Sequence, residues 1–306
     1  MNDVNRRGLR WVLLVVILAW GILLRAGPAG AQMAPGPEVC KNCHEEKVAS
    51  YLLTKHSMKV DARTPAARGG CSVCHGDGTE HVKAGGGRGV GGIKNPGSKT
   101  VPSEEKNALC LTCHEGGKRM QWSLSLHASR DTACTSCHKV HDSHDPVREK
   151  TTQADVCFNC HKEQRAQINR PYRHPIPEAK VVCSDCHNPH GSVGPKLMVR
   201  DNVNDTCYTC HMEKRGPFVR THQPVQEDCS ICHQPHGTTN PNLLKVRPPF
   251  LCQSCHEPTS HRANVATLGT SGSSANFLAR GCVNCHTQIH GTNNPDSAGT
   301  TRAFRR

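Results

Sequence analysis

The sequence predicts a largely irregular chain with a few short helices and no sheet of any size. Three observations carry this prediction. The pattern Cys-x-x-Cys-His occurs ten times and uses all 20 cysteines of the 306 residues. Aromatic residues make up only 4% of the chain, which is too little for an ordinary packed core. The segments between the patterns are interrupted by many of the 27 glycines and 20 prolines, which break regular secondary structure.

Each copy of the pattern has the form of an attachment site for c-type haem. The two thiols form thioethers with the haem, and the histidine that follows is the proximal ligand of the iron. A zinc site or a redox dithiol needs only the cysteines, and a disulfide scaffold gives no reason for a histidine after every second cysteine. The sequence therefore predicts ten covalently bound c-type haems, at motifs numbered here one to ten along the chain.

The predicted attachment residues are Cys40, Cys43, Cys71, Cys74, Cys110, Cys113, Cys134, Cys137, Cys157, Cys160, Cys183, Cys186, Cys207, Cys210, Cys229, Cys232, Cys252, Cys255, Cys282 and Cys285. The predicted proximal ligands are His44, His75, His114, His138, His161, His187, His211, His233, His256 and His286.

Eleven further histidines are available as distal ligands for ten haems. The ten predicted distal ligands are His56, His81, His127, His141, His174, His190, His222, His236, His261 and His290. His144 is the spare, because it follows His141 in the polar run HDSHD. A haem with two protein ligands has no open position for a substrate, so this set predicts electron transfer and not catalysis.

The motifs alternate in type and predict five two-haem repeats, which begin near residues 40, 110, 157, 207 and 252. Most odd-numbered motifs have a free histidine 11 to 13 residues after the proximal one, and most even-numbered motifs have one after three residues. A histidine three residues past a proximal ligand cannot reach the opposite face of the same iron. We therefore expect it to ligate a neighbouring haem and to link one repeat to the next. The spacings of His81 and His261 depart from this pattern.

Residues 1–31 are predicted to be a secretory signal, which leaves residues 32–306 as the decahaem domain. Three arginines precede the apolar run 11–24, and Ala-Gly-Ala at 29–31 resembles a cleavage site. An uncleaved anchor is the alternative, although the run is shorter than the roughly 20 residues of a membrane span. Either form predicts a haem domain in the periplasm. The glycine-rich segment 82–109 is predicted to be a mobile surface loop, with partner docking as the alternative.

The formal net charge of +13 does not predict a nucleic-acid partner. Each haem brings two propionates that are ionised near neutral pH, so ten haems would offset the excess of lysine and arginine. We expect most of these cations to neutralise propionates.

Two features carry a resemblance to a known family. Even-numbered motifs read CSDCHNPHG and CSICHQPHG, and the last motif reads CVNCHTQIHGTNNP. Together with the number of motifs, they resemble the periplasmic decahaem cytochromes of outer-membrane electron conduits, the MtrA/DmsE/PioA group. The resemblance implies a multihaem cytochrome c fold, an elongated array of bis-histidine haems. It also implies insertion into an outer-membrane β-barrel porin, periplasmic or inner-membrane cytochromes as electron donors or acceptors, and an extracellular multihaem cytochrome as a further partner.

Two other functions compete with the conduit. A soluble periplasmic carrier fits the composition equally well. A multihaem reductase needs one haem with an open face, and eleven free histidines for ten haems argue against it, as does the absence of a Cys-x-x-Cys-Lys motif. We therefore predict an electron-transfer protein and not an enzyme.

Overall fold

The computed structural model describes residues 36–256, 281–284 and 286–294. The predicted signal, His261 and Cys285 lie outside the described residues. The chain forms two units, the first made of residues 1–52 and 56–95 and the second of residues 53–55 and 96–306. Motifs one and two belong to the first unit, and motifs three to ten belong to the second.

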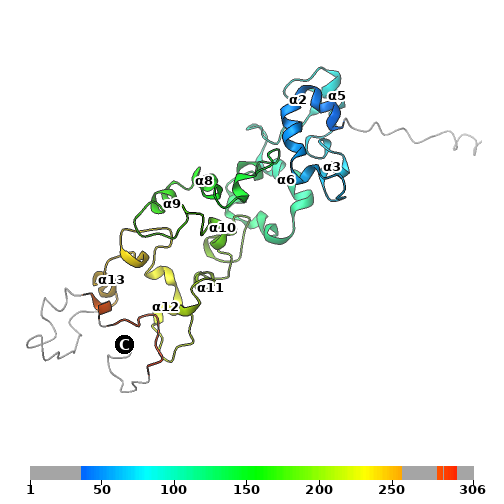
Figure 1. Ribbon diagram of the computed structural model, residues 1–306. Coiled ribbons are helices and arrows are strands. Elements are labelled where there is room, and N and C mark those ends of the chain that lie inside the picture. The colour runs from blue at the N-terminus through cyan, green and yellow to red at the C-terminus, as the bar shows by residue number, and fades with distance from the viewer. Residues whose placement is uncertain (1–35, 257–280, 285, 295–306) are drawn as a thin grey trace, which may run out of the picture. The chain divides into compact units, whose positions relative to one another are not determined.

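The first unit is built from short helices around its two motifs (Figure 1). They are α2 (Pro37–Leu52), α3 (Pro65–Arg68), α4 (Ser72–His75), α5 (Thr79–Lys83) and the 3₁₀ helix η2 (Val90–Gly92). The backbone of α2 is interrupted at His44, whose φ and ψ are −119° and 44°. The first motif therefore ends at a kink, after which α2 runs on to Leu52.

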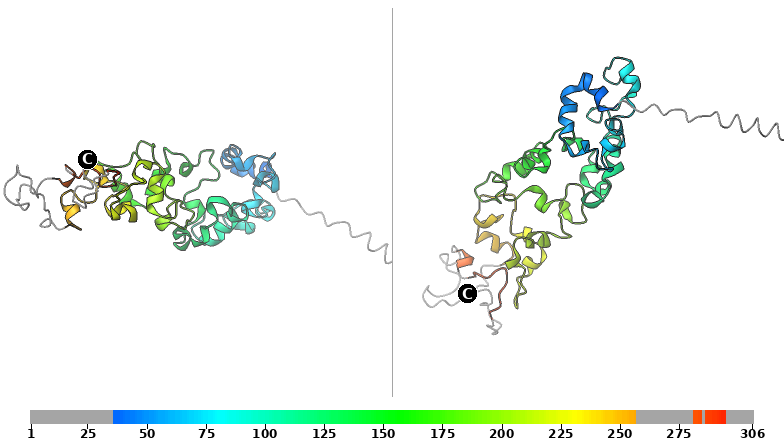
Figure 2. Two further views of the ribbon diagram at one scale, coloured as in Figure 1. Left: turned by 90° about the horizontal axis from the view of Figure 1, so that it is seen from below. Right: turned by 45° about the vertical axis from the view of Figure 1, so that its right-hand side comes forward.

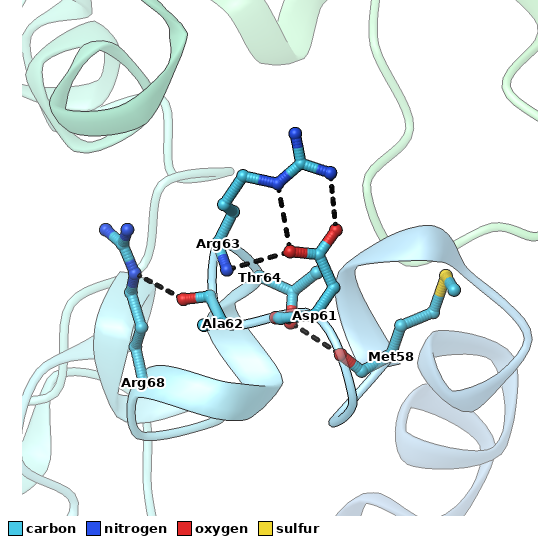
Figure 3. A network of polar contacts seen from close by, with 6 residues as sticks. All are labelled: Met58, Asp61, Ala62, Arg63, Thr64 and Arg68. Carbon is cyan, nitrogen blue, oxygen red and sulfur yellow. Dashed lines mark hydrogen bonds and ion pairs between the residues drawn. The ribbon is translucent and has the colours of Figure 1, made fainter.

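An ordered turn precedes the second motif (Figure 3). The guanidinium of Arg63 donates two hydrogen bonds to the carboxylate of Asp61, at 3.0 and 2.8 Å. The hydroxyl of Thr64 donates to the carbonyl of Met58 at 2.7 Å, and Nε of Arg68 donates to the carbonyl of Ala62 at 3.0 Å. The hydrogen bond from Arg63 lowers the pKa of Asp61 to about 2. These contacts close the chain on itself between α2 and α3.

The second unit consists of short helices joined by 3₁₀ turns and irregular segments (Figures 1 and 2). The α-helices are α6 (Ser103–His114), α7 (Leu126–Ser129), α8 (Gln153–Phe158), α9 (Lys162–Gln167), α10 (Cys183–Cys186), α11 (Val203–Tyr208), α12 (Gln223–Glu227) and α13 (Phe250–Gln253). The described residues contain isolated β-bridges but no strand, so the predicted mostly irregular, small-helix fold is confirmed.

The isolated bridges recur along the second unit. His187 is bridged to Met198 in the third repeat, and His233 is bridged to Leu244 at the same offsets in the fourth. Successive repeats therefore have the same local backbone structure.

The apolar core of the described residues is small, as the composition predicted. The buried hydrophobic side chains are Val48, Ala133, Phe158, Ile168 and Val182. Among the described helices, none is both long enough and apolar enough to cross a membrane.

Candidate haem-binding sites

A single helical turn shapes the attachment motifs. In motif five the amide of His161 donates to the carbonyl of Cys157 at 3.0 Å, and in motif nine the amide of His256 donates to that of Cys252 at 2.8 Å. Residues three and four apart lie on one face of such a turn. The two cysteines and the histidine of a motif are therefore presented together, as attachment to one haem requires. No disulfide joins any of the described cysteines.

The first cysteines of two successive motifs lie against each other. The first cysteines interact electrostatically in five pairs, Cys40 with Cys71, Cys110 with Cys134, Cys157 with Cys183, Cys207 with Cys229, and Cys252 with Cys282. Each pair joins an odd-numbered motif to the even-numbered motif that follows. Each pair lies within one of the two-motif repeats that the sequence predicts, and the repeats stay a prediction.

A buried side-chain amide links the two motifs within each of three repeats. Oδ1 of Asn107, in α6, accepts from the amide of Cys134 at 2.7 Å, and Oδ1 of Asn204, in α11, accepts from the amide of Cys229 at 2.7 Å. Oε1 of Gln153, in α8, accepts from the amide of Ser184 at 2.9 Å. Each amide comes three or four residues before an odd-numbered motif. We call Asn107, Gln153 and Asn204 the linking amides.

The structure brings seven predicted proximal histidines next to seven predicted distal ones. The ring pairs, with the distances between ring centres, are His44–His81 (6.4 Å), His161–His127 (6.1 Å), His138–His190 (6.0 Å), His211–His174 (6.2 Å), His187–His236 (6.2 Å), His256–His222 (5.9 Å) and His233–His290 (6.1 Å). Every one of these pairs joins a histidine of a Cys-x-x-Cys-His motif to a histidine outside the motifs.

These distances fit two rings bound to opposite faces of one iron. With metal–nitrogen bonds of about 2.0–2.1 Å and ring centres about 1.1 Å beyond the nitrogens, two trans imidazoles have centres about 6.2–6.4 Å apart. The observed range of 5.9–6.4 Å agrees with this value. The paired rings are thus spaced to hold a bis-histidine haem between them.

The pairs follow a simple order in the second unit. A free histidine after an odd-numbered motif lies beside the proximal histidine of the next odd motif, as His127 lies beside His161. A free histidine after an even-numbered motif lies beside the proximal histidine of the previous even motif, as His190 lies beside His138. Six of the seven pairs therefore join neighbouring repeats. The pair His44–His81 lies within one repeat.

Comparison with known proteins identifies the family. Residues 174–216 and 222–261 match the doubled CXXCH motif, and residues 71–154 match the cytochrome c-type protein NrfB-like family. The chain is 43% identical to the multiheme cytochrome MtrA of Shewanella baltica strain OS185, over 85% of this chain and 79% of that protein. The chain belongs to the MtrA-type multihaem cytochromes. Its motifs bind c-type haem covalently, and it transfers electrons.

Hydrogen bonds at Nδ1 orient the rings of this multihaem cytochrome. Six rings lie with Nδ1 2.7–3.1 Å from a backbone carbonyl, namely those of His75, His81, His127, His174, His187 and His233. A carbonyl oxygen can only accept, so each Nδ1 carries the proton and Nε2 keeps its lone pair. This is the tautomer that binds a metal through Nε2.

Burial keeps several of the paired rings neutral. Desolvation lowers the pKa of His190 to about 4 and also lowers the pKa values of His233, His236 and His290. A metal binds the neutral imidazole, so burial favours the form that ligates iron.

The glycine-rich segment holds two histidines of the first unit, a role that the sequence did not indicate. The carbonyl of Val90 accepts from Nδ1 of His81 at 3.1 Å, and that of Lys94 accepts from Nδ1 of His75 at 2.8 Å. Gly91, with a φ of 69°, passes so close that a Cβ there would collide with the backbone of Glu80 and His81. The acceptors are backbone atoms, and no side-chain pattern marks them.

In the second unit, the glycine of each Pro-His-Gly sequence also allows two backbone segments to approach closely. A Cβ at Gly191 would collide with the carbonyl of Gln121, and one at Gly237 would collide with the carbonyl of Gln167. Both glycines have a positive φ, of 112° and 153°. Each therefore lets the segment that carries a free histidine pass directly over the preceding repeat.

For the other described ligands, axial ligation stays a prediction. They are His56, His75, His114, His141 and His286. His144, the predicted spare, has an 84% exposed side chain whose Nδ1 lies 2.9 Å from the carboxylate of Glu149.

Proposed function

We propose that this cytochrome carries electrons along a row of ten bis-histidine haems between the periplasm and the cell exterior. The observation that supports it is the order of the ring pairs. In the second unit, two pairs connect each repeat to the next, so haems bound there would follow one another without a break.

The haem, the cysteines and the paired histidines have separate roles. Bound haem supplies a one-electron Fe(III)/Fe(II) couple. The cysteines would fix each haem to the chain, and the two rings of a pair would take both axial positions. Since no axial position is left for a substrate, the residues favour electron transfer over catalysis. A high-spin ferric signal in the fully loaded protein would contradict this assignment.

We further propose that the protein acts in the periplasm, inserted in an outer-membrane β-barrel porin. The signal sequence and the similarity to MtrA support this location. A chain with so few apolar segments cannot face lipid, so passage through the outer membrane requires a barrel around it. Cytochromes of the periplasm or inner membrane would exchange electrons at one end, and an extracellular multihaem cytochrome at the other.

Gentle detergent extraction of outer membranes tests this placement. We expect the haem-stained chain to co-purify with a β-barrel protein in a fixed ratio. Recovery only from the soluble periplasmic fraction, with no barrel, would instead establish a diffusible electron carrier.

A further inference from the structure

Asp145 places a carboxylate within hydrogen-bond distance of a predicted ligand ring, whereas the carboxylate of Glu213 lies 3.7 Å from Nδ1 of His211. Oδ2 of Asp145 lies 2.6 Å from Nδ1 of His138, the proximal histidine of motif four. An ionised carboxylate only accepts hydrogen bonds, so the ring is the donor. The acceptors at the six rings described above are neutral backbone carbonyls. At His236 the partner is the neutral amide oxygen of Gln167, at 3.1 Å.

The chain departs from its own repeat to place this carboxylate. In motifs six and eight, the acceptor is a backbone carbonyl nine residues beyond the proximal histidine, that of Lys196 or Asn242. In motif four, Asp145 stands seven residues beyond His138, directly before the 3₁₀ helix η6 (Pro146–Arg148).

The carboxylate is held in place and shielded from water. The amide of Lys139 donates to its other oxygen, Oδ1, at 3.2 Å. Its side chain is only 16% exposed. An ionic hydrogen bond is stronger in such surroundings than at the surface, because water competes less for the two groups.

The ring on the other side, that of His190, has no comparable partner. Its Nδ1 is buried and makes no hydrogen bond in the described part of the chain. The cations Lys118 and Arg119 also act on this ring, but neither hydrogen-bonds to its Nδ1 in the described residues. Asp145 is the charged group that has a hydrogen bond to a ring nitrogen of this pair.

A carboxylate on Nδ1 makes an imidazole a stronger electron donor to its metal. The ferric site carries one more positive charge than the ferrous site, so a stronger donor stabilises the ferric form. Reduction here takes one electron from a neighbouring haem, and no bond or proton changes.

We propose that Asp145 makes the haem of motif four the site of lowest reduction potential among motifs four, six and eight. Electrons would occupy this haem least, so it forms an energetic step inside the row. The proposal rests on the proposed bis-histidine ligation of these motifs.

The direct test is a redox titration, followed by haem absorbance, of the full-length, haem-loaded Asp145→Asn variant. The substitution keeps the size of the side chain and removes its charge. We expect one haem's share of the absorbance change to move to higher potential. A tenfold change in the reduction equilibrium of that haem would appear as a shift of about 59 mV. A titration that coincides with the wild type would overturn the proposal.

A matched control is available four residues away. Glu149→Gln removes the same charge beside His144, the exposed spare histidine. We expect its titration to coincide with the wild type. A shift equal to that of Asp145→Asn would show that general charge, and not the bond to His138, sets the potential.

Nε2 of Gln167 donates to the carboxylate of Glu163 at 2.9 Å, so the reciprocal variant exchanges the two residues. Gln167→Glu combined with Glu163→Gln places a carboxylate at Nδ1 of His236 and leaves the net charge unchanged. We expect the reduction potential of the haem between His187 and His236 to fall. This result tests the proposal even if Asp145→Asn binds little haem. No downward shift would overturn the proposal. Haem content and the low-spin spectrum are recorded in every variant. A wild-type protein without full haem content or without a low-spin spectrum would refute the proposed ligation. Variants with unchanged haem content, unchanged spectrum and unchanged reduction potentials would refute only the role of Asp145.

Discussion

In the first unit, the ring beside His44 comes from the same repeat, whereas in the second unit the paired rings come from neighbouring repeats. The means of support differ too. The inner repeats use the linking amides, and the first unit uses carbonyls of a glycine-rich segment. The first repeat has no amide side chain at the equivalent position, which is occupied by Pro37.

This difference shows how a row of linked repeats can end. An inner motif borrows a ring from the repeat before or after it, and the first odd-numbered motif has no earlier repeat to borrow from. A free histidine with its own spacing, His81, supplies the ring locally. A hydrogen bond to the glycine-rich segment then orients that ring, a role that a neighbouring repeat has elsewhere in the chain.

The largest effect is expected from breaking an inter-repeat pair. His233→Ala removes the proximal ring that faces His290, so we expect a chain that matures poorly or lacks one haem. Haem content per chain measures this. His144→Ala is the control and should retain full haem content. Unchanged haem content and electron-transfer rate in His233→Ala would contradict the assignment.

A smaller and more local effect is expected at the end of the row. In Gly91→Ala, the new Cβ collides with the backbone at His81 and displaces that ring. We expect one haem to become high-spin, which electron paramagnetic resonance detects. Gly92→Ala is a close control, because Gly92 has a similar φ of 71° but open space around its Cβ position. If both variants gave the same spectrum, strain alone would explain it.

The linking amides should contribute stability without affecting ligation. Asn204→Ala leaves the buried amide of Cys229 without its acceptor, which costs about 1–3 kcal/mol. Denaturation of the haem-loaded protein should show this loss while the haem spectrum stays unchanged. The control is Asn169→Ala, which removes an exposed bond to the carbonyl of Arg165. An equal loss in the control would argue against a special role for Asn204.

The smallest effect is expected in the turn before motif two. Asp61→Asn removes an ion pair with Arg63, whose side chain is 87% exposed, and surface pairs of this kind contribute little to stability. We expect the same denaturation midpoint as in the wild type. A clear drop would mean that this turn supports the first unit more than its exposure indicates.

The sequence predicted the haem motifs, the two-motif repeats and the short-helix fold, because covalent attachment requires specific residues at fixed spacing. It also marked His81 as irregular. It did not predict the direction of pairing, since that depends on how the repeats stack. The linking amides look like ordinary polar helix residues until their buried partners are known. The acceptors at Val90 and Lys94 are backbone atoms, so their role depends on conformation alone. In the sequence, Asp145 is one acidic residue in a polar run, and nothing there indicates its contact with His138.

The alternating direction of the ring pairs has a consequence for biosynthesis. In the six pairs of the second unit, motifs five, seven and nine lie beside a ring from chain that precedes them, and motifs four, six and eight lie beside a ring from chain that follows them. When a chain is exported from its N-terminus onward, the ring for motif five is already outside when that motif emerges. Motif four must wait until His190 emerges, 52 residues after His138. We expect chains truncated just before His190 to carry motif four with one axial ring, and a high-spin signal from that site would reveal it. Three of these six pairs would thus be completed as the chain is delivered, and the other three one repeat later.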